Sequence, residues 1–251
     1  MKRINVNNGL KMMVACCVLV PLAFQGEAMA GQITLSPSNA IGGTPVYNSL
    51  NVASPAPFNQ GVEAAGDIFD NQTGPVSEPT HTGFWLNPDA NDGGSNQPYI
   101  LVNLGGPYQL SSIELFNTHN STSNNRGTSH FEILGGNAVA TSGGNGYVLS
   151  GPSTMLVNCS ANCALSSVVG DDPIPGQSFT PTDVVNDYQY LEFIGISVVA
   201  GAKTSTSFGL NEMRVFGTAA PVPELPAPLM LGTGVLVPWI ARRRRALSIS
   251  V

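Results

Sequence analysis

The sequence predicts an all-β protein, built as an antiparallel β-sandwich or barrel. Between residues 31 and 220 it consists of short segments rich in β-branched and aromatic residues, separated by clusters of Gly, Asn, Ser and Pro. No stretch keeps a helical period over three turns. Several short strands with turn signals between them are typical of sandwiches and barrels.

The clearest predicted strand covers residues 100–104, where apolar side chains alternate before the turn signal Gly105-Gly106-Pro107. The same pattern predicts further strands over residues 110–116, 130–134, 147–149, 154–157, 188–199 and 210–216. Residues 31–66 are expected to lead into the domain or to add an edge strand to it.

The N-terminal 30 residues have the layout of a secretory signal peptide with a helical apolar core. Basic residues precede an apolar run over residues 12–24, and Ala28-Met29-Ala30 places small residues where signal peptidase reads them. We therefore expect cleavage by signal peptidase between Ala30 and Gly31, and export through the inner membrane. Cys16 and Cys17 are expected to leave with this peptide.

The C-terminal region has a three-part layout. The motif Val222, Pro223 and Glu224 is followed by an apolar segment over residues 225–240 and an arginine cluster at 242–245. The apolar segment contains three prolines and is shorter than the roughly 20 residues that a lasting transmembrane helix needs. The arginines favour a basic end held on the cytoplasmic side.

Residues 221–246 resemble the PEP-CTERM sorting signal of Gram-negative bacteria. The family's Val-Pro-Glu-Pro motif is matched by Val222, Pro223 and Glu224, and the chain departs from it at Leu225. The resemblance implies a hydrophobic C-terminal helix that inserts transiently into the inner membrane, and processing by an exosortase-like protease. It predicts delivery to the cell surface or extracellular matrix. The alternative is an ordinary single C-terminal anchor.

Between the two signals lies enough sequence for one domain of ordinary size. It has three basic residues, Arg126, Lys203 and Arg214, against fourteen acidic ones, so its net charge is −11. We expect no nucleic-acid partner, because phosphate binding needs clustered Lys and Arg. An acidic surface suits an exported protein and divalent cations.

Two cysteines remain in the domain, Cys159 and Cys163. In an oxidising compartment they are expected to form a small disulfide loop. A zinc site is the alternative, but it needs two further ligands, and His130 has no partner at a recognised spacing. So short a loop shapes a local turn more than it stabilises the domain.

Three parts of the domain together resemble the discoidin family, the coagulation factor 5/8 type C domains. These are residues 67–73 with Trp85, then 98–105 with 110–115 and 124–133, and finally 188–193 with 208–217. The resemblance runs from about Asp67 to Gly217. It implies a galactose-binding-like jelly-roll β-sandwich over residues 67–220, whose members often bind glycans or lipid head groups through loops at one end.

The discoidin resemblance also implies a structural calcium ion, Ca²⁺. In similar domains an aspartate of the early loop and a glutamate of the last strand hold this ion, which maps onto Asp70 and Glu212, with Thr73 as a further ligand. Calcium takes six to eight oxygen ligands. Shared coordination would tie the early loop to the last strand. The alternative is that Asp70 only caps a turn through side-chain hydrogen bonds.

The polar loop over residues 117–129 is a second candidate site. It carries His119, Asn124 and Arg126, whose donors suit sugar hydroxyls, and Trp85 is expected to supply an aromatic face for a sugar ring. The alternatives are that Arg126 forms an internal ion pair and that Trp85 belongs to the core.

Catalysis is not expected in this domain. It has three histidines and no Gly-x-Ser-x-Gly motif, and the carboxylates of Asp70 and Glu212 are assigned to a metal. Two functions remain. One is a surface or matrix module that binds extracellular polysaccharide, and the other is a purely structural surface protein without a ligand pocket.

Overall fold

The computed structural model describes residues 30–46, 56–61, 63–73, 83–88, 97–118, 126–166, 174–199 and 207–221. The expected signal peptide up to residue 29, the C-terminal segment from Val222 onward, and the loop residues His119 and Asn124 lie outside these ranges. Within them, no helix is long and apolar enough to cross a membrane.

Nearly all regular structure in the described ranges is β-strand, as predicted. The strands are β1 (Gly31–Gln32), β2 (Ala40–Gly43), β3 (Trp85–Pro88), β4 (Tyr99–Phe116), β5 (Phe131–Gly136), β6 (Val139–Thr141), β7 (Tyr147–Leu149), β8 (Ser153–Cys159), β9 (Gly176–Phe179), β10 (Asp187–Gly195), β11 (Ser207–Leu210) and β12 (Glu212–Ala219). The described helical turns are short 3-10 segments, η1 (Pro37–Asn39), η2 (Ala65–Phe69) and η4 (Gly143–Asn145).

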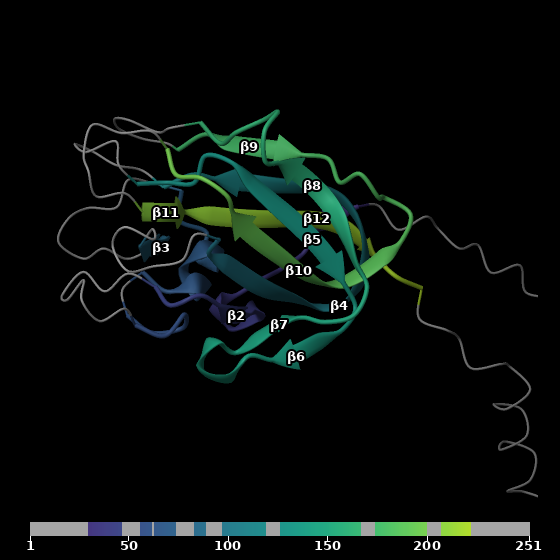
Figure 1. Ribbon diagram of the computed structural model, residues 1–251. Coiled ribbons are helices and arrows are strands. Elements are labelled where there is room, and N and C mark those ends of the chain that lie inside the picture. The colour runs from purple at the N-terminus through teal and green to yellow at the C-terminus, as the bar shows by residue number, and fades with distance from the viewer. Residues whose placement is uncertain are drawn as a thin grey trace, which may run out of the picture.

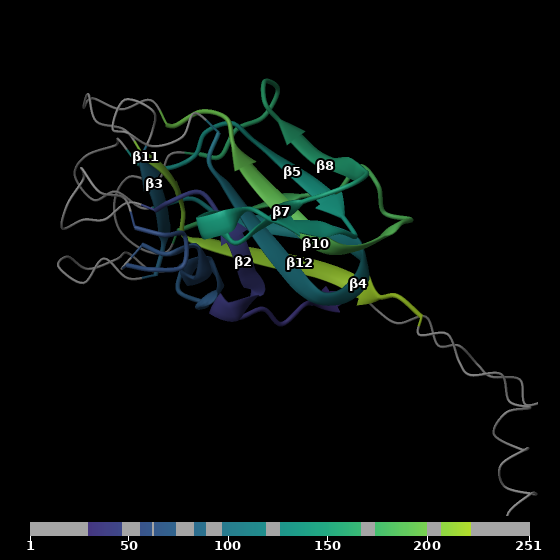
Figure 2. The same ribbon diagram turned by 60° about the horizontal axis from the view of Figure 1, so that its bottom comes forward.

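The main sheet has the order β1-β12-β4-β10-β5-β8, and β2 and β9 also pair with β4. All these pairs are antiparallel. The first part of β4 pairs with β10 and β2, and its last part pairs with β12 and β9, so β4 connects the two layers of a sandwich. Figures 1 and 2 show these layers from two sides. The predicted antiparallel jelly-roll sandwich is confirmed.

Strand β4 corrects the turn predicted at residues 105–107. The strand continues through this run, and Gly105 adopts a φ of 83°. Opposite it, the register with β10 shifts between Tyr188 and Tyr190, because Tyr188 faces Tyr108 and Tyr190 faces Asn103. The extra residues form a bulge, and bulges bend a strand without ending it. The two strands predicted on either side of this glycine run are therefore one bent strand.

Other strand boundaries also differ from the predicted ones. The strand predicted over 188–199 ends at Gly195, and the one predicted over 210–216 is divided at Asn211 between β11 and β12. In residues 31–66, β1 pairs with β12 at the edge of the main sheet and β2 pairs with β4.

The core lies between the two layers and is centred on three aromatic rings. Phe131 and Phe193 stack with their centroids 5.5 Å apart, and Trp85 meets Phe193 edge-on at 6.2 Å. All three side chains are completely buried. Burying a large apolar side chain contributes about 1.5–3 kcal/mol, so these rings are a main source of stability.

The sandwich has two distinct ends (Figure 1). Strands β3 and β11 and the start of β12 lie at one end, which we call the loop end. The opposite end contains the last residues of β12 and the first residues of β10, and we call it the tail end. Gly31 pairs with Gly217 near the end of β12, so both described chain ends leave the sandwich side by side at the tail end.

The predicted disulfide joins Cys159 at the end of β8 to Cys163. Cys159 is completely buried and Cys163 is exposed. The bond closes a turn that leads to Leu165, whose backbone N–H donates to the carbonyl of Ser129 at 2.8 Å. The disulfide therefore fixes the direction in which the chain leaves the edge of the sheet.

Replacing both cysteines by alanine is expected to lower the free energy of unfolding by about 2 kcal/mol, the loop-entropy value for so short a ring. Urea denaturation of the Cys159→Ala/Cys163→Ala variant measures this loss. Wild-type protein in a reducing agent is the matched control and should lose a similar amount. Equal stability of the reduced and oxidised wild type would contradict the prediction.

Candidate functional site

The two carboxylates predicted to bind calcium come together at the loop end. Asp70 directly follows η2, Glu212 begins β12, and these two elements pack against each other. The backbone N–H of Asn71 donates to Oε2 of Glu212 across 3.2 Å. The early loop and the last strand are therefore joined at this point.

Asp70 also caps its own turn, which was the alternative reading of this residue. Its Oδ1 accepts a hydrogen bond from the backbone N–H of Gln72 at 2.9 Å, and Asn71 adopts a left-handed φ of 60°. Oδ2 points toward Gly83, where a Cβ atom would lie 3.1 Å from it and 3.4 Å from Oε1 of Gln72. The absence of a side chain at Gly83, whose φ is 94°, leaves space beside these two oxygens.

The carboxyls of Glu212 and Asp70 both have raised pKa values, because burial desolvates them and little positive charge lies nearby. Burial raises the pKa of Glu212 to about 7, and the negative charge of Asp70 adds to this effect. Burial also raises the pKa of Asp70. Arg214 opposes the rise at Glu212, but its Nε lies 3.8 Å from Oε1 of Glu212 while its Nη1 lies 3.6 Å from Oε2 of Glu114. One shared arginine therefore compensates for several carboxylates.

The amide side chains of Gln72 and Asn211 add two oxygen atoms that were not predicted from the sequence. Asn211 donates from Nδ2 to the carbonyl of Gln72 at 3.0 Å, and its buried Oδ1 has no hydrogen-bond partner among the described residues. A buried acceptor without a partner costs about 1–3 kcal/mol, which a cation at this position would offset. The only sequence signal for Asn211 is that it directly precedes Glu212.

This donor set fits calcium. Calcium prefers hard oxygen ligands from carboxylates, amide side chains and backbone carbonyls. No three His, Cys, Asp or Glu side chains in the described ranges cluster as a metal site, so amide and carbonyl oxygens would have to complete the shell. Thr73 contributes a backbone carbonyl that already accepts from the N–H of Ile174 at 3.1 Å. If calcium binds here, Asp70, Gln72, Asn211 and Glu212 would hold it together with the carbonyl of Thr73.

The base of the predicted ligand loop is held by the buried side chain of Asn117. Its Nδ2 donates to the carbonyls of Thr128 and Ser166, both at 2.9 Å, and its Oδ1 accepts from the N–H of Thr128 at 3.1 Å. Arg126 is half-buried next to this clamp and forms a parallel bridge with Ser207 of β11. His119 and Asn124 belong to the part of the loop outside the described residues.

The structure corrects the role expected of Trp85. Its side chain is completely buried and packs edge-on against Phe193, so it offers no face to a sugar ring. The reason is the position of β3, which pairs with β11 and is buried at all four of its residues. Trp85 is therefore a core residue, which was the alternative prediction from the sequence.

Comparisons with known proteins give matches among solved structures only; no protein-family model and no curated protein matches the chain. The family 32 carbohydrate-binding module of C. perfringens NanJ, solved in complex with galactose, is 14% identical with a TM-score of 0.45, over 75% of this chain and 99% of that one. A chitosan-binding module of a chitosanase/glucanase from Paenibacillus sp. IK-5 is 16% identical with a TM-score of 0.41, over 74% and 99%.

A fucolectin from the serum of the striped bass, Morone saxatilis, is 16% identical with a TM-score of 0.42, over 77% of this chain and 52% of that one. The sugars named here are ligands of those proteins, not of this chain. The strand order and register of this chain, rather than these scores, define its class as an antiparallel β-sandwich.

Proposed function

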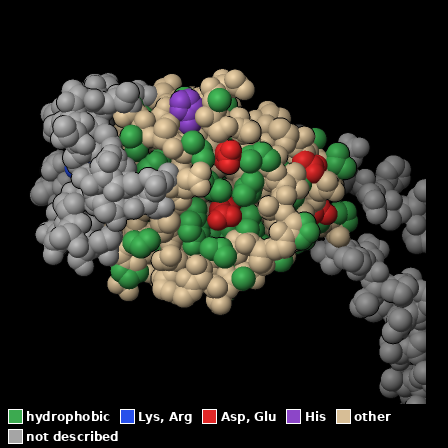
Figure 3. Space-filling view, in the orientation of Figure 1, with side chains coloured by type: hydrophobic (Ala, Val, Ile, Leu, Met, Phe, Trp, Pro, Cys, Tyr) green, Lys and Arg blue, Asp and Glu red, His purple; other side chains and the backbone are tan. Residues whose placement is uncertain are grey.

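We propose that the chain is an exported, non-catalytic protein of the cell surface or extracellular matrix, whose β-sandwich binds polysaccharide at a loop end organised by calcium. The observations that carry this proposal are the electrostatic coupling of Asp70 with Glu212 and the buried Oδ1 of the adjacent residue Asn211, which has no partner among the described residues. When bound, calcium would neutralise the two carboxylates and fix the early loop against β12. The acidic side chains scattered over the face in Figure 3 suit a cation-rich exterior.

Calorimetric titration of calcium into chelator-treated protein tests the metal site. We expect one ion per domain and a higher melting temperature, with both effects lost in Asp70→Asn. Glu132→Gln is the matched control, because Glu132 lies on β5 and is not among the residues of the candidate metal site. No heat of binding and no change in melting temperature in the wild type would refute the site.

Retention on polysaccharide affinity gels tests the ligand loop. Arg126→Ala is expected to weaken retention without loss of folding, which a cooperative thermal transition of the variant would show. Unchanged retention of this variant would show that the loop does not bind the polysaccharide.

A purely structural surface protein is the second candidate, and the burial of Trp85 favours it because it removes the expected stacking face. Failure to bind any gel, together with assembly into filaments or matrix, would support this candidate. Retention of the soluble mature protein would reject it.

The proposed route to the surface uses signal peptidase and an exosortase-like protease, with transient insertion into the inner membrane. Cleavage between Ala30 and Gly31 would leave the whole of β1 in the mature domain, because β1 begins at Gly31. The intact mass of the mature protein tests both cuts. We expect the loss of residues 1–30 and of the segment that follows the motif at Val222–Pro223–Glu224. A mass that extends to Val251 would instead identify an ordinary anchor.

A further inference from the structure

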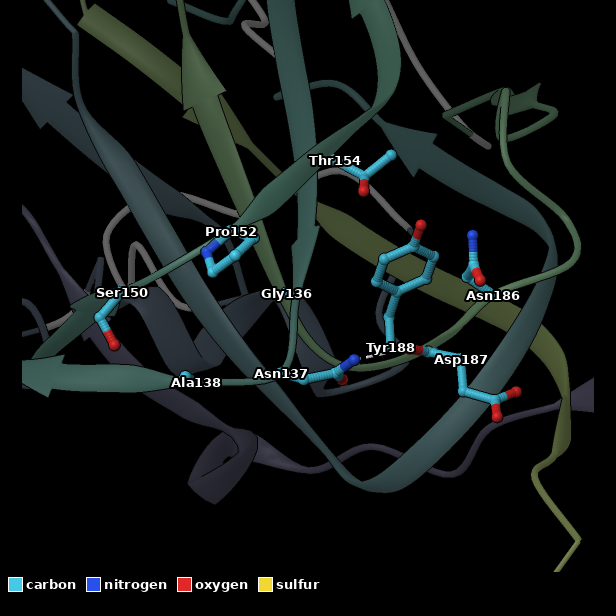
Figure 4. Close-up of a pocket in the computed structure, with 9 residues that line it drawn as sticks. All are labelled: Gly136, Asn137, Ala138, Ser150, Pro152, Thr154, Asn186, Asp187 and Tyr188. Carbon is cyan, nitrogen blue, oxygen red and sulfur yellow. Dashed lines mark hydrogen bonds between the residues drawn. The ribbon is translucent and has the colours of Figure 1, made fainter.

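A hollow of about 530 Å³ opens at the tail end of the sandwich (Figure 4). Three separate segments form it: the turn after β5, the connection from β7 to β8, and the start of β10. Its volume falls within the range of small-ligand pockets, about 300–1,000 Å³. The loop end and the tail end are separated by the length of the sheet, about 20 Å for a six-residue strand such as β5.

The walls of the hollow are already held in place by hydrogen bonds. Asn137 donates to the carbonyl of Asp187 and accepts from the N–H of Gln189, both at 2.8 Å, which fixes the turn after β5 against β10. On the other side, Oδ2 of Asp183 accepts from the hydroxyl of Tyr188 at 2.7 Å and from Nδ2 of Asn186 at 2.6 Å. These bonds hold the pKa of Asp183 well below its usual value. Such preorganisation lowers the entropic cost of binding.

The floor of the hollow depends on a glycine next to an aromatic ring. A Cβ atom at Gly135 would lie 2.7 Å from the ring of Tyr188, so only glycine lets this ring lie flat against β5. The ring is 4% exposed and belongs to the core, so it closes the floor without offering a stacking face. Pro152 lies across the hollow from it and supplies an exposed C–H surface (Figure 4).

The chemistry of the lining suits an uncharged, hydroxyl-rich ligand. Ser150, Thr154 and Asn186 add two hydroxyls and an amide to the lining from different segments, with Ser150 and Asn186 on opposite sides of the hollow (Figure 4). The described lining contains no Lys or Arg, and the carboxylate of Asp187 lies nearby, although Figure 4 shows it turned away from the other lining side chains. Both features disfavour anions such as phosphate or uronate. Convergent polar groups around a partly apolar floor are the usual design of a small-ligand site.

We propose that this hollow is a saccharide subsite for one or two neutral sugar residues, separate from the loop end. This subsite would extend the proposed function, and the bridging described next rests on that function because it needs sugar binding at the loop end as well. A domain that holds sugars at both ends can bridge two polysaccharide chains, and it would then contribute to a matrix through binding rather than through self-assembly.

Backbone NMR titration of the mature protein with methyl glycosides of galactose, glucose and N-acetylglucosamine tests the subsite. We expect amide shifts at Gly136, Asn137 and Asn186 with at least one of these sugars. The Ser150→Ala/Thr154→Val variant should weaken that binding about tenfold or more, since it removes two hydrogen-bonding hydroxyls and keeps the shape of the site. Ser153→Ala is the matched control, because Ser153 is exposed next to the hollow but does not line it.

Methyl glucuronide should bind at least tenfold more weakly than the matching neutral sugar, because of the nearby carboxylate. Shifts at the loop end alone would overturn the subsite and leave the proposed function intact. Shifts at the hollow alone would support the subsite and overturn sugar binding by the loop end. No shifts at either end with any of the three sugars would overturn both.

Discussion

Chelated protein is expected to lose about 3 kcal/mol of its free energy of unfolding through Glu212 as the pH rises from 4.5 to 8. In the unfolded chain this carboxyl has a pKa of 4.5, and burial beside Asp70 raises it to about 7 in the folded protein. Between these values the folded state holds more protons, so the stability that Glu212 contributes is greatest below pH 4.5 and falls until the pH passes 7. The size of the loss follows because a difference of one between the folded and unfolded pKa corresponds to about 1.4 kcal/mol.

The Glu212→Gln variant isolates this contribution. Asp67, whose pKa burial raises to about 6, and Glu192, whose pKa burial also raises, add to the slope in the same direction. Urea denaturation at several pH values should therefore show a smaller slope in Glu212→Gln, with the remainder due to the other groups. Equal slopes in the wild type and in this variant would contradict the prediction.

Saturating calcium is expected to reverse this behaviour near neutral pH. A bound cation favours the ionised carboxylates, and a ligand that binds only the folded state stabilises it in proportion to the logarithm of its concentration. The difference in melting temperature between calcium and chelator should thus grow from pH 5 to pH 8. Glu192→Gln is the matched control, because it removes another buried carboxylate and should keep the full calcium response.

The alternation of apolar and polar residues predicted most of the sheet correctly, because each strand has one face in the core. It failed where the backbone departs from regular geometry. At Gly105 the run of turn residues predicts a break, but the residues before and after this run pair with neighbouring strands, which keeps β4 continuous through a bulge. Such pairing depends on strands that are remote in sequence, so local patterns cannot reveal it.

The candidate sites were harder to predict than the fold, for a related reason. A tryptophan that follows a polar loop suggests a binding face, yet the burial of Trp85 depends on β11, which is more than a hundred residues away. Apart from the position of Asn211 directly before Glu212, the amide oxygens at Gln72 and Asn211 have no signature in the sequence, because their role depends on which way each side chain turns. The hollow at the tail end combines three segments that only the fold brings together.

Replacing Asn117 by alanine is expected to cost about 3 kcal/mol, among the largest effects of any polar substitution in this domain. The side chain is 2% exposed, and its loss removes a donor from the buried carbonyl of Thr128 and another from the carbonyl of Ser166, which is exposed. Each buried polar group without a partner costs about 1–3 kcal/mol. The buried N–H groups of Thr118 and Thr128 both lose Oδ1 as an acceptor, and among the described residues only that of Thr128 keeps another, the carbonyl of Gly209 at 3.1 Å.

Asn137→Ala is the matched control, because the same side chain there also makes two hydrogen bonds to the backbone but is exposed. Water can replace those bonds, so we expect a cost below about 1 kcal/mol. Urea denaturation compares the two variants, and hydrogen exchange at Thr128 reports the clamp directly. Asn117→Asp should cost at least as much as Asn117→Ala, because it aims an oxygen at two carbonyl oxygens. Equal costs at positions 117 and 137 would mean that Asn117 does not hold the ends of the loop together, and the loop would then need another anchor to act as a binding site.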